Sequence, residues 1–498
     1  MPRARSAGPG GYDQRNRMNR LGRRTALSIS CLLLSSLAGL PLHTAAAAED
    51  ERGYVVVLKD SVADPKAAAS RQTRAYGGSG ATVVYGHALK GYAATMTPAQ
   101  ATALEKDPQV RFVAAQRTYK VSPPPQPVSP PPLPAPPLRD CQEVLDDVPP
   151  IRQCQPVFVD RVRADRSSAR SGNGKGSVDV NVAVLDSGIA ADVPDLNVQG
   201  GVDCLSGSPV FPGTSLQDPS GHGTMVAGII GGRDDDQGLV GVAPGTPQWA
   251  VKVADDDQGL ITDAALLCGI DWVVSTRTDA DPDNDIALFN MSLGSESTPT
   301  EKDDGQCGVV NQDPLHLAIC NTVAAGVTPV ASAGNEHADV ASVIPAAYDE
   351  VITTTAMADF DGRPGAKVAP ICYGRDFGFF GDADDEASLP FSNFARSAAD
   401  RKHTVAAPGV CNESNFPLPH HHAFGDGTSF AAPVVSGVLA LCIDTRRCGS
   451  SSPARNVREL VNDARKYNDH DRRYGFFGDP HRPIPGRYYG PLIAADRY

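Results

Sequence analysis

Val182-Ala-Val-Leu-Asp186-Ser-Gly188 is the stretch of this 498-residue chain that best indicates its fold. Its apolar run is typical of a buried strand, and it ends in a carboxylate and a glycine. Similar apolar segments alternate with helical patterns. The expected strands are Val180–Leu185, Trp249–Val253, Ile286–Met291 and Val327–Ala331, and the expected helices are Gly223–Ile230, Ala264–Ser275, Leu315–Ala324 and Ser429–Leu441. This alternation predicts an α/β fold with a mostly parallel central sheet and helices on both faces.

Two further motifs place polar groups where helices are expected to begin. Gly221-His222-Gly223-Thr224 precedes one helix, and Gly427-Thr428-Ser429-Phe-Ala-Ala-Pro433 opens a long apolar one. Functional groups of such sheets gather at the carboxyl ends of the strands. Acyl transfer needs a hydroxyl nucleophile, an imidazole base and a carboxylate that orients the imidazole. The alternative, that these residues only form turns and helix caps, does not explain why all three motifs occur together.

The three motifs, in the chain order Asp, His, Ser, resemble those of the subtilisin-like serine peptidases, the subtilase family. The resemblance implies a subtilisin-like fold and a serine endopeptidase whose catalytic triad is Asp186, His222 and Ser429. It also implies that Asn335, at the end of Ala331-Ser-Ala-Gly-Asn335, donates its side-chain amide to the oxyanion. Phe430 stands where methionine is common in the family, which would change the packing under the nucleophile without removing function.

The resemblance also identifies a segment that binds substrate. Ser292, Leu293 and Gly294 look like the family's segment that pairs with the substrate backbone as an added strand. The implied partners are polypeptide substrates.

A small α+β unit precedes this domain, at residues 52–121. Tyr54–Leu58 and Val110–Val113 read as strands, and Thr97 reads as the N-cap of a helix with Pro98 at its first position. The unit resembles the propeptide of the same family, which acts as a folding aid and an intramolecular inhibitor. The likeness is carried by Tyr54-Val-Val-Val-Leu-Lys59, Lys90-Gly-Tyr92-Ala and Asp107-Pro-Gln-Val110. It implies that the end of the unit, Tyr119–Val121, lies in the active site and is cut by the enzyme itself.

The remaining segments set the expected boundaries. Residues 1–48 have the layout of a secretory signal peptide: basic residues, an apolar run over Ala26–Leu40, and small residues at the end. Arg23-Arg24 leaves twin-arginine export open. From Pro123 to Pro137, ten of fifteen residues are proline, which favours an extended spacer. We therefore expect a signal peptide (1–48), a propeptide (49–121), a proline-rich linker (122–147) and a peptidase domain (148–498). The mature N-terminus is left open between Ser122 and Val148.

Composition agrees with a secreted enzyme. The formal net charge of -13 argues against nucleic acid as a partner. Of 11 cysteines, Cys31 lies in the signal peptide, and the remaining ten can pair in an oxidising compartment. The close-spaced candidates are Cys141 with Cys154, Cys307 with Cys320, and Cys442 with Cys448. Zinc binding is the alternative, although no CxxC pair is present. We expect a monomer without a stable membrane anchor.

Weaker signals concern metals. No cofactor is required for the chemistry, and a metal site is unknown from the sequence. Structural calcium is one option, because subtilases commonly bind it and carboxylates alternate along a loop. The carboxylates are Asp279, Asp281, Asp283 and Asp285, with a lesser claim for Asp234–Asp236. An acidic segment at Gly374–Ser388 looks like an insertion, and His420–His422 reads as a solvated loop.

Two competing functions remain open at this point. A non-catalytic scaffold could use the same fold to bind peptides, but it would not need an intact triad. A transpeptidase would keep the triad and pass the acyl group to an amine, which the mass of the products would reveal.

Overall fold

A computed structural model of the chain describes residues 50–121, 153–205, 216–255, 258–296, 302–365, 368, 372, 382–419, 421–449 and 451–498. The expected signal peptide and proline-rich linker, together with Cys31, Cys141, His420 and residues 374–381, lie outside the described residues. Within the described ranges, no helix combines the length and the apolar character needed to cross a bilayer.

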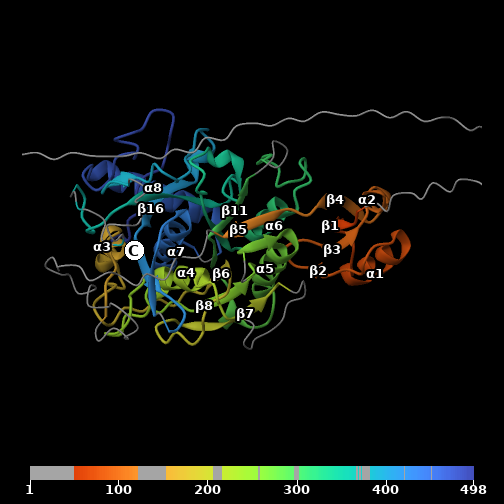
Figure 1. Ribbon diagram of the computed structural model, residues 1–498, viewed down its shortest axis with the longest axis horizontal. Coiled ribbons are helices and arrows are strands. Elements are labelled where there is room, and N and C mark those ends of the chain that lie inside the picture. Colours follow the sequence, from red (N-terminus) through yellow and green to blue (C-terminus); the bar gives the residue numbers. More distant parts are fainter. Residues whose placement is uncertain are drawn as a thin grey trace, which may run out of the picture. The chain divides into compact units, whose positions relative to one another are not determined.

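The larger part of the molecule is built on an eight-stranded sheet (Figure 1). The strand order is β15-β14-β12-β10-β6-β8-β7, with β16 also paired to β14. All neighbours run parallel except β15, which is antiparallel to β14. The bounds are β6 Val182–Asp186, β7 Val198–Asp203, β8 Gln248–Lys252, β10 Leu288–Met291, β12 Thr328–Ser332, β14 Ile352–Ala358, β15 Glu386–Ala387 and β16 Thr404–Val410. The predicted α/β class and mostly parallel sheet are confirmed.

Helices cover both faces of this sheet because side chains of a strand alternate between its faces. In β6, Val182 and Val184 belong to one apolar core with residues of α4 (His222–Gly231), α7 (Thr428–Asp444) and α8 (Pro453–His470). Ala183 and Leu185 belong to a second core with residues of α5 (Asp263–Thr276) and α6 (Pro314–Ala324). Figure 1 shows β6 between α4 and α5. Burial on both faces explains the continuous apolar run of the motif.

The N-terminal unit is a four-stranded antiparallel sheet in the order β2-β3-β1-β4, with two helices. Its elements are β1 Arg52–Leu58, α1 Pro65–Tyr76, β2 Val83–Tyr85, β3 Gly91–Met96, α2 Pro98–Leu104 and β4 Val110–Ala115. Thr97 caps α2 in a reciprocal pair with Gln100, so the predicted helix start is confirmed. Val56 and Leu58 pack inside the unit, whereas Val55 and Val57 share the core of α5 and α6. One face of the small sheet therefore packs on the larger domain.

Shorter strands complete the fold. β5 (Thr118–Val121), β9 (Leu260–Thr262), β11 (Leu293–Glu296) and β13 (Val343–Ile344) form a second sheet, and β17 (Asn412–Asn415) pairs with β18 (His422–Gly425). A short helix, α3 (Val157–Arg161), precedes the first strand of the large sheet.

The predicted disulfides Cys307–Cys320 and Cys442–Cys448 are confirmed. Cys204–Cys268 and Cys372–Cys411 are additional pairs. Cys154 is also disulfide-bonded, and its predicted partner, Cys141, lies outside the described residues.

The C-terminal tail, residues 471–498, packs onto the domain. Tyr474, Phe476 and Tyr489 are fully buried in a cluster with side chains of β14 and β16. In β16, the Ala406 N–H donates a hydrogen bond to the carbonyl of Pro491, and the Ala406 carbonyl accepts one from the Ile493 N–H. The tail therefore covers part of the sheet that would otherwise be exposed.

Candidate active site

Asp186 ends β6 and His222 begins α4, and the fold brings the two side chains together. His222 Nδ1 lies 2.7 Å from Asp186 Oδ1, with both side chains fully buried. Burial opposes protonation of the imidazole, but the charge of Asp186 and its hydrogen bond outweigh that effect, so the pKa of His222 is raised. Nε2 of His222 is buried and has no hydrogen-bond partner among the described residues. With Nδ1 held by the carboxylate, Nε2 is available to take a proton from a nucleophile.

Asp218, which the sequence analysis did not single out, fixes the turn before His222. Its Oδ1 accepts a hydrogen bond from the Gly221 N–H at 2.9 Å, and its Oδ2 accepts from Thr224 N–H and Oγ1 at 2.8 Å each. These bonds satisfy backbone donors at the start of α4. Gly221 has a φ of 81°, in the left-handed region, and a Cβ there would meet the ring of Phe416. The motif therefore needs its glycine for local geometry.

Ser429 is the second residue of α7, and its neighbours hold it from two directions. Ser429 Oγ donates a hydrogen bond to the carbonyl of Ser292 at 3.2 Å, and Ser292 Oγ donates to the carbonyl of Ser429 at 2.6 Å. The ring of Phe430, the next residue, has its centroid 5.3 Å from that of His222. Asn412 Nδ2 also donates to the Phe430 carbonyl at 3.0 Å. The Ser429 hydroxyl thus lies at the N-terminus of α7, where the helix dipole favours negative charge, and the following residue packs against the imidazole.

Asn335 follows β12 and faces the start of α7. Its Oδ1 accepts hydrogen bonds from the backbone N–H and from Oγ1 of Thr428, each at 2.9 Å. Thr428 Oγ1 in turn accepts from the Gly334 N–H at 3.1 Å. Because the carbonyl oxygen of the amide is held by Thr428, the amide nitrogen points away from that residue. This orientation suits a donor aimed at a developing oxyanion.

The segment expected to bind an extended chain already holds one. β5 lies between β9 and β11 and pairs antiparallel with both. Leu293 and Gly294 are opposite Val121 and Lys120. The Val121 N–H also donates to the Gly259 carbonyl at 3.1 Å. The end of the N-terminal unit therefore occupies the position of an added strand next to Ser292 and Ser429.

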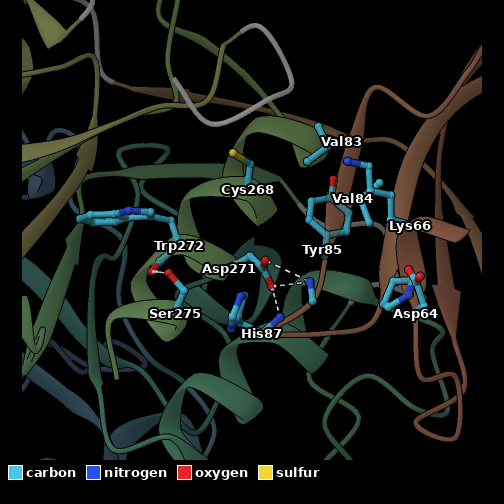
Figure 2. A pocket seen from close by; sticks show the side chains of 12 residues that line it. Asp64, Lys66, Val83, Val84, Tyr85, His87, Cys268, Asp271, Trp272 and Ser275 are labelled. Atoms are coloured by element: carbon cyan, nitrogen blue, oxygen red, sulfur yellow. Dashed lines mark hydrogen bonds between the residues drawn. The ribbon is translucent and has the colours of Figure 1, made fainter. Parts of the chain in front are cut away.

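The N-terminal unit has a second attachment, on α5. The Asp271 carboxylate accepts hydrogen bonds from the backbone N–H groups of Gly86, His87 and Ala88, and Figure 2 shows it facing that turn. A pocket of about 360 Å³ opens beside this contact, lined by both parts of the chain. It lies among residues such as Lys66, Tyr85 and Trp272, which belong to α1, β2 and α5. The pocket is a gap in the contact between the N-terminal unit and the larger domain, and its lining does not include Asp186 or His222.

Several carboxylates in the loops expected to bind calcium already have hydrogen-bond or ion-pair partners within the protein. Asp279 accepts hydrogen bonds from Asp281 N–H and Asn284 Nδ2, and Asp285 lies 3.1 Å from Arg277. Asp234 accepts from four backbone N–H groups in the segment 172–176. His422, from the histidine run, pairs with Glu413 at 2.9 Å. A different group, Asp359, Asp361 and Asp384, brings three carboxylate oxygens within 4.8 Å of one another.

Comparison with known proteins identifies both parts of the chain. The family model described as "Subtilase family" matches residues 177–476, and that described as "Peptidase inhibitor I9" matches residues 53–122. Subtilisin DY of Bacillus licheniformis is 29% identical over 304 residues, covering 60% of this chain and 89% of that protein. Subtilisin of Bacillus pumilus is 29% identical over 307 residues, covering 61% and 90%. Subtilisin BL of Lederbergia lenta is 31% identical over 302 residues, covering 60% and 88%.

Proposed function

The chain belongs to the subtilase family and is a serine endopeptidase with an inhibitor-type propeptide, and on that premise we propose that Asp186, His222 and Ser429 form its catalytic triad. The observation that carries the proposal is the buried 2.7 Å contact between Asp186 and His222, with Nε2 left without a partner among the described residues. Further support comes from the ring of Phe430, the residue after Ser429, which packs against the His222 ring.

The proposed reaction follows from these positions. Ser429 Oγ attacks the carbonyl carbon of the substrate peptide bond while His222 Nε2 takes its proton. Asp186 stabilises the resulting imidazolium, and the side-chain amide of Asn335 stabilises the oxyanion. His222 then gives the proton to the leaving amine, and the acyl group stays on Ser429. A water molecule then attacks the acyl carbon while His222 Nε2 takes its proton. His222 passes that proton to Ser429 Oγ as the product with the new carboxylate leaves. No step requires a cofactor.

We also propose that Ser292, Leu293 and Gly294 hold the substrate backbone. Support comes from β5, which pairs with Leu293 and Gly294 in the way an extended substrate would. Because β5 belongs to the chain itself and occupies the position of the substrate, it blocks the cleft. The precursor is therefore inhibited until β5 is cut and released. We place the propeptide at residues 49–121 and the peptidase domain at 148–498. A domain boundary before residue 153 is supported by two backbone hydrogen bonds. The N–H groups of Gln153 and Cys154 donate to the carbonyls of Asp236 and Gly238.

Export is the third part of the proposal. Residues 1–48 would act as a signal peptide that is removed, and the disulfides suit an oxidising compartment. The mature enzyme is expected to be a monomer without a membrane anchor. Calcium, if bound, would support structure only; a chelator that lowers the unfolding temperature, with recovery on adding Ca²⁺, would identify it.

The test is the length of the exported chain. The unaltered protein and a Ser429→Ala variant are secreted from an oxidising host and measured by intact mass and N-terminal sequencing. We expect the unaltered chain to begin between Ser122 and Val148 and the variant to keep residues 49–121. Ser452→Ala, an exposed serine at the start of α8, is the matched control and should be processed normally. Equal lengths for all three chains would refute self-processing by Ser429.

A further inference from the structure

A buried pocket with two carboxylates lies next to β5, at the end of that strand where Arg117 precedes it. Asp263 is the first residue of α5, and Asp313 is the N-cap of α6. Their side chains are 0% and 2% exposed, although both are carboxylates. Such groups are rarely buried without a partner of opposite charge. The partner here comes from the propeptide.

Arg117 and Tyr119 enter this pocket from the segment that forms β5. Arg117 Nη2 lies 3.1 Å from Asp263 Oδ1 and 2.8 Å from Asp313 Oδ1, so one guanidinium bridges both carboxylates. Arg117 Nε and its backbone N–H donate to Asp263 Oδ2 at 3.1 and 2.7 Å. The hydroxyl of Tyr119 donates to Asp263 Oδ1 at 2.6 Å. Charge-assisted bonds of this kind are both strong and geometrically selective.

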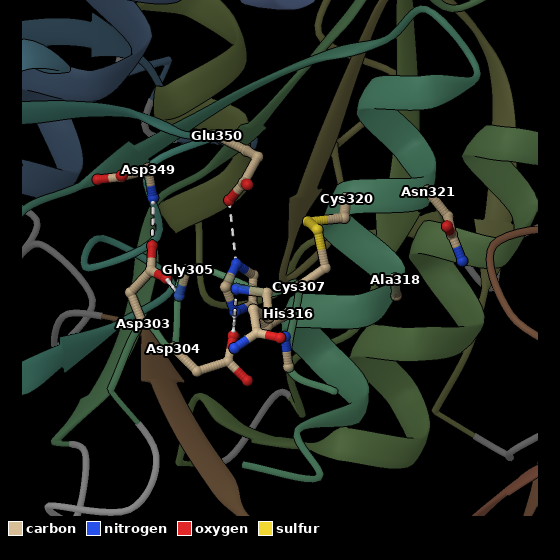
Figure 3. Close-up of a disulfide and its surroundings, with 12 residues drawn as sticks. Asp303, Asp304, Gly305, Cys307, His316, Ala318, Cys320, Asn321, Asp349 and Glu350 are labelled. Carbon is tan, nitrogen blue, oxygen red and sulfur yellow. Dashed lines mark hydrogen bonds and ion pairs between the residues drawn. A yellow bond between two sulfur atoms is a disulfide. The ribbon is translucent and has the colours of Figure 1, made fainter. Parts of the chain in front are cut away.

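The peptidase domain holds Asp313 in place by itself. Asp313 Oδ1 accepts hydrogen bonds from Leu315 and His316 N–H, and Oδ2 accepts from the Tyr348 hydroxyl at 2.6 Å. The His316 ring stacks on Tyr348, with centroids 4.1 Å apart. Figure 3 shows His316 between Asp304 and Glu350, close to the Cys307–Cys320 disulfide that ties the preceding loop to α6. This half of the pocket is therefore preorganised before any ligand enters.

Asp263 has no such support. Every side-chain hydrogen bond that it accepts from the described residues comes from Arg117 or Tyr119. Within the same residues, Arg117 is the sole basic group that pairs with Asp263 or Asp313. When the propeptide leaves, the cleft keeps two carboxylates without their cation. A substrate that covers the two carboxylates without supplying a cation in place of Arg117 leaves buried negative charge unpaired. That arrangement is unfavourable in free energy, so such a substrate binds more weakly.

We propose that this pocket selects substrates, and that the preferred ones are polypeptides with an arginine two residues before a tyrosine, a few residues upstream of the cut bond. The inference rests on the proposed function, since it assumes that substrates add to β9 and β11 as β5 does. In that register the side chains of Tyr119 and Val121 point inward, while those of Thr118 and Lys120 are exposed. The positions between arginine and tyrosine, and after the tyrosine, therefore tolerate many residues.

The experiment is a cleavage-site profile of the mature enzyme, prepared from the full chain, on a denatured protein mixture read by mass spectrometry. We expect Arg-x-Tyr upstream of the cut bond to be enriched over its frequency in the mixture. Peptides containing this motif are then compared with copies in which arginine becomes glutamine or tyrosine becomes phenylalanine. The arginine change should lower kcat/KM by roughly tenfold or more, and the tyrosine change by less. Because these comparisons use one unaltered enzyme, they do not depend on the folding of a variant.

Asp263→Asn provides the matching change in the enzyme and should reduce the preference for arginine over glutamine. Asp271→Asn is the control, because Asp271 also holds the propeptide but lies outside the pocket, so the profile should not change. Cleavage without Arg-x-Tyr enrichment, or a preference that survives Asp263→Asn, would overturn the inference and leave the pocket as a propeptide anchor. Absence of any cleavage that depends on Ser429 would instead refute the proposed function.

Discussion

The side-chain oxygen of Asn335 accepts hydrogen bonds from both the N–H and the hydroxyl of Thr428, the residue just before Ser429. The amide is therefore oriented by the same turn that positions the proposed nucleophile. The two groups cannot shift independently, which is what a preorganised oxyanion site requires.

Asn335→Ala should lower kcat by about 100- to 1,000-fold, because the proposed donor to the oxyanion is lost, while KM changes little. Thr428→Val should give a smaller loss of kcat, since it removes only the hydroxyl that orients the amide. Thr428→Ser retains that hydroxyl and should restore most of the activity. Steady-state kinetics on one peptide substrate measures all three. Equal losses for the valine and serine variants would show that the hydroxyl has no role in orientation.

The contact between Asp186 and His222 predicts the pH dependence of the enzyme. The raised pKa of His222 means that the inactive imidazolium persists above the ordinary histidine range, so kcat/KM should rise with pH through a midpoint above about 6.5. Asp186→Asn removes the charge that raises this pKa and leaves the burial that lowers it. Its midpoint should move to lower pH, and its kcat should fall by about ten-thousandfold. A midpoint that stays in place would show that Asp186 does not set the pKa.

The sequence predicted the central fold well, because local signals and tertiary structure agree there. The run before Asp186 is buried on both faces, so it is apolar throughout, and the helices that begin near His222 and Ser429 lie within a few residues of their predicted bounds. Thr97 was identified as a cap from its local pattern. Helix α8 was missed although it carries an apolar stripe at helical spacing, formed by Val457, Leu460, Val461 and Ala464.

Long-range contacts could not be predicted from the sequence. The segment around Asp385 was interpreted as an acidic insertion. In the structure Asp385 and Asp359 flank Arg161, whose side chain is fully buried, at 2.6 and 2.5 Å. Asp263, Asp313 and Arg117 likewise meet although up to 196 residues separate them in the chain. No periodic pattern marks such pairs, because each carboxylate looks like an ordinary surface or cap residue in its own segment.

The contact of Asp271 with the propeptide predicts how inhibition can be weakened. Asp271→Ala removes both carboxylate oxygens, and with them every hydrogen bond that this side chain accepts from the N–H groups of Gly86, His87 and Ala88. We expect the time between cutting and full activity to shorten, with a roughly tenfold or greater loss of propeptide affinity. Activity on a small peptide, followed after processing begins, measures this lag. An unchanged lag would show that the strand in the cleft alone controls release.

The disulfides should differ in their contribution to stability because they close loops of different length. Cys204–Cys268 spans 64 residues and Cys442–Cys448 spans 6. Loop-closure entropy predicts that replacing the first pair with serine lowers the free energy of unfolding by about 4 kcal/mol, and the second by about 2 kcal/mol. Cys204 follows β7 and Cys268 lies in α5, so the first bond also ties the edge of the sheet to the helix that carries Asp263. Denaturant unfolding of the inactive Ser429→Ala precursor avoids self-digestion and allows the two double variants to be compared directly. A larger effect for the short loop would mean that local packing at Cys442, and not loop closure, dominates.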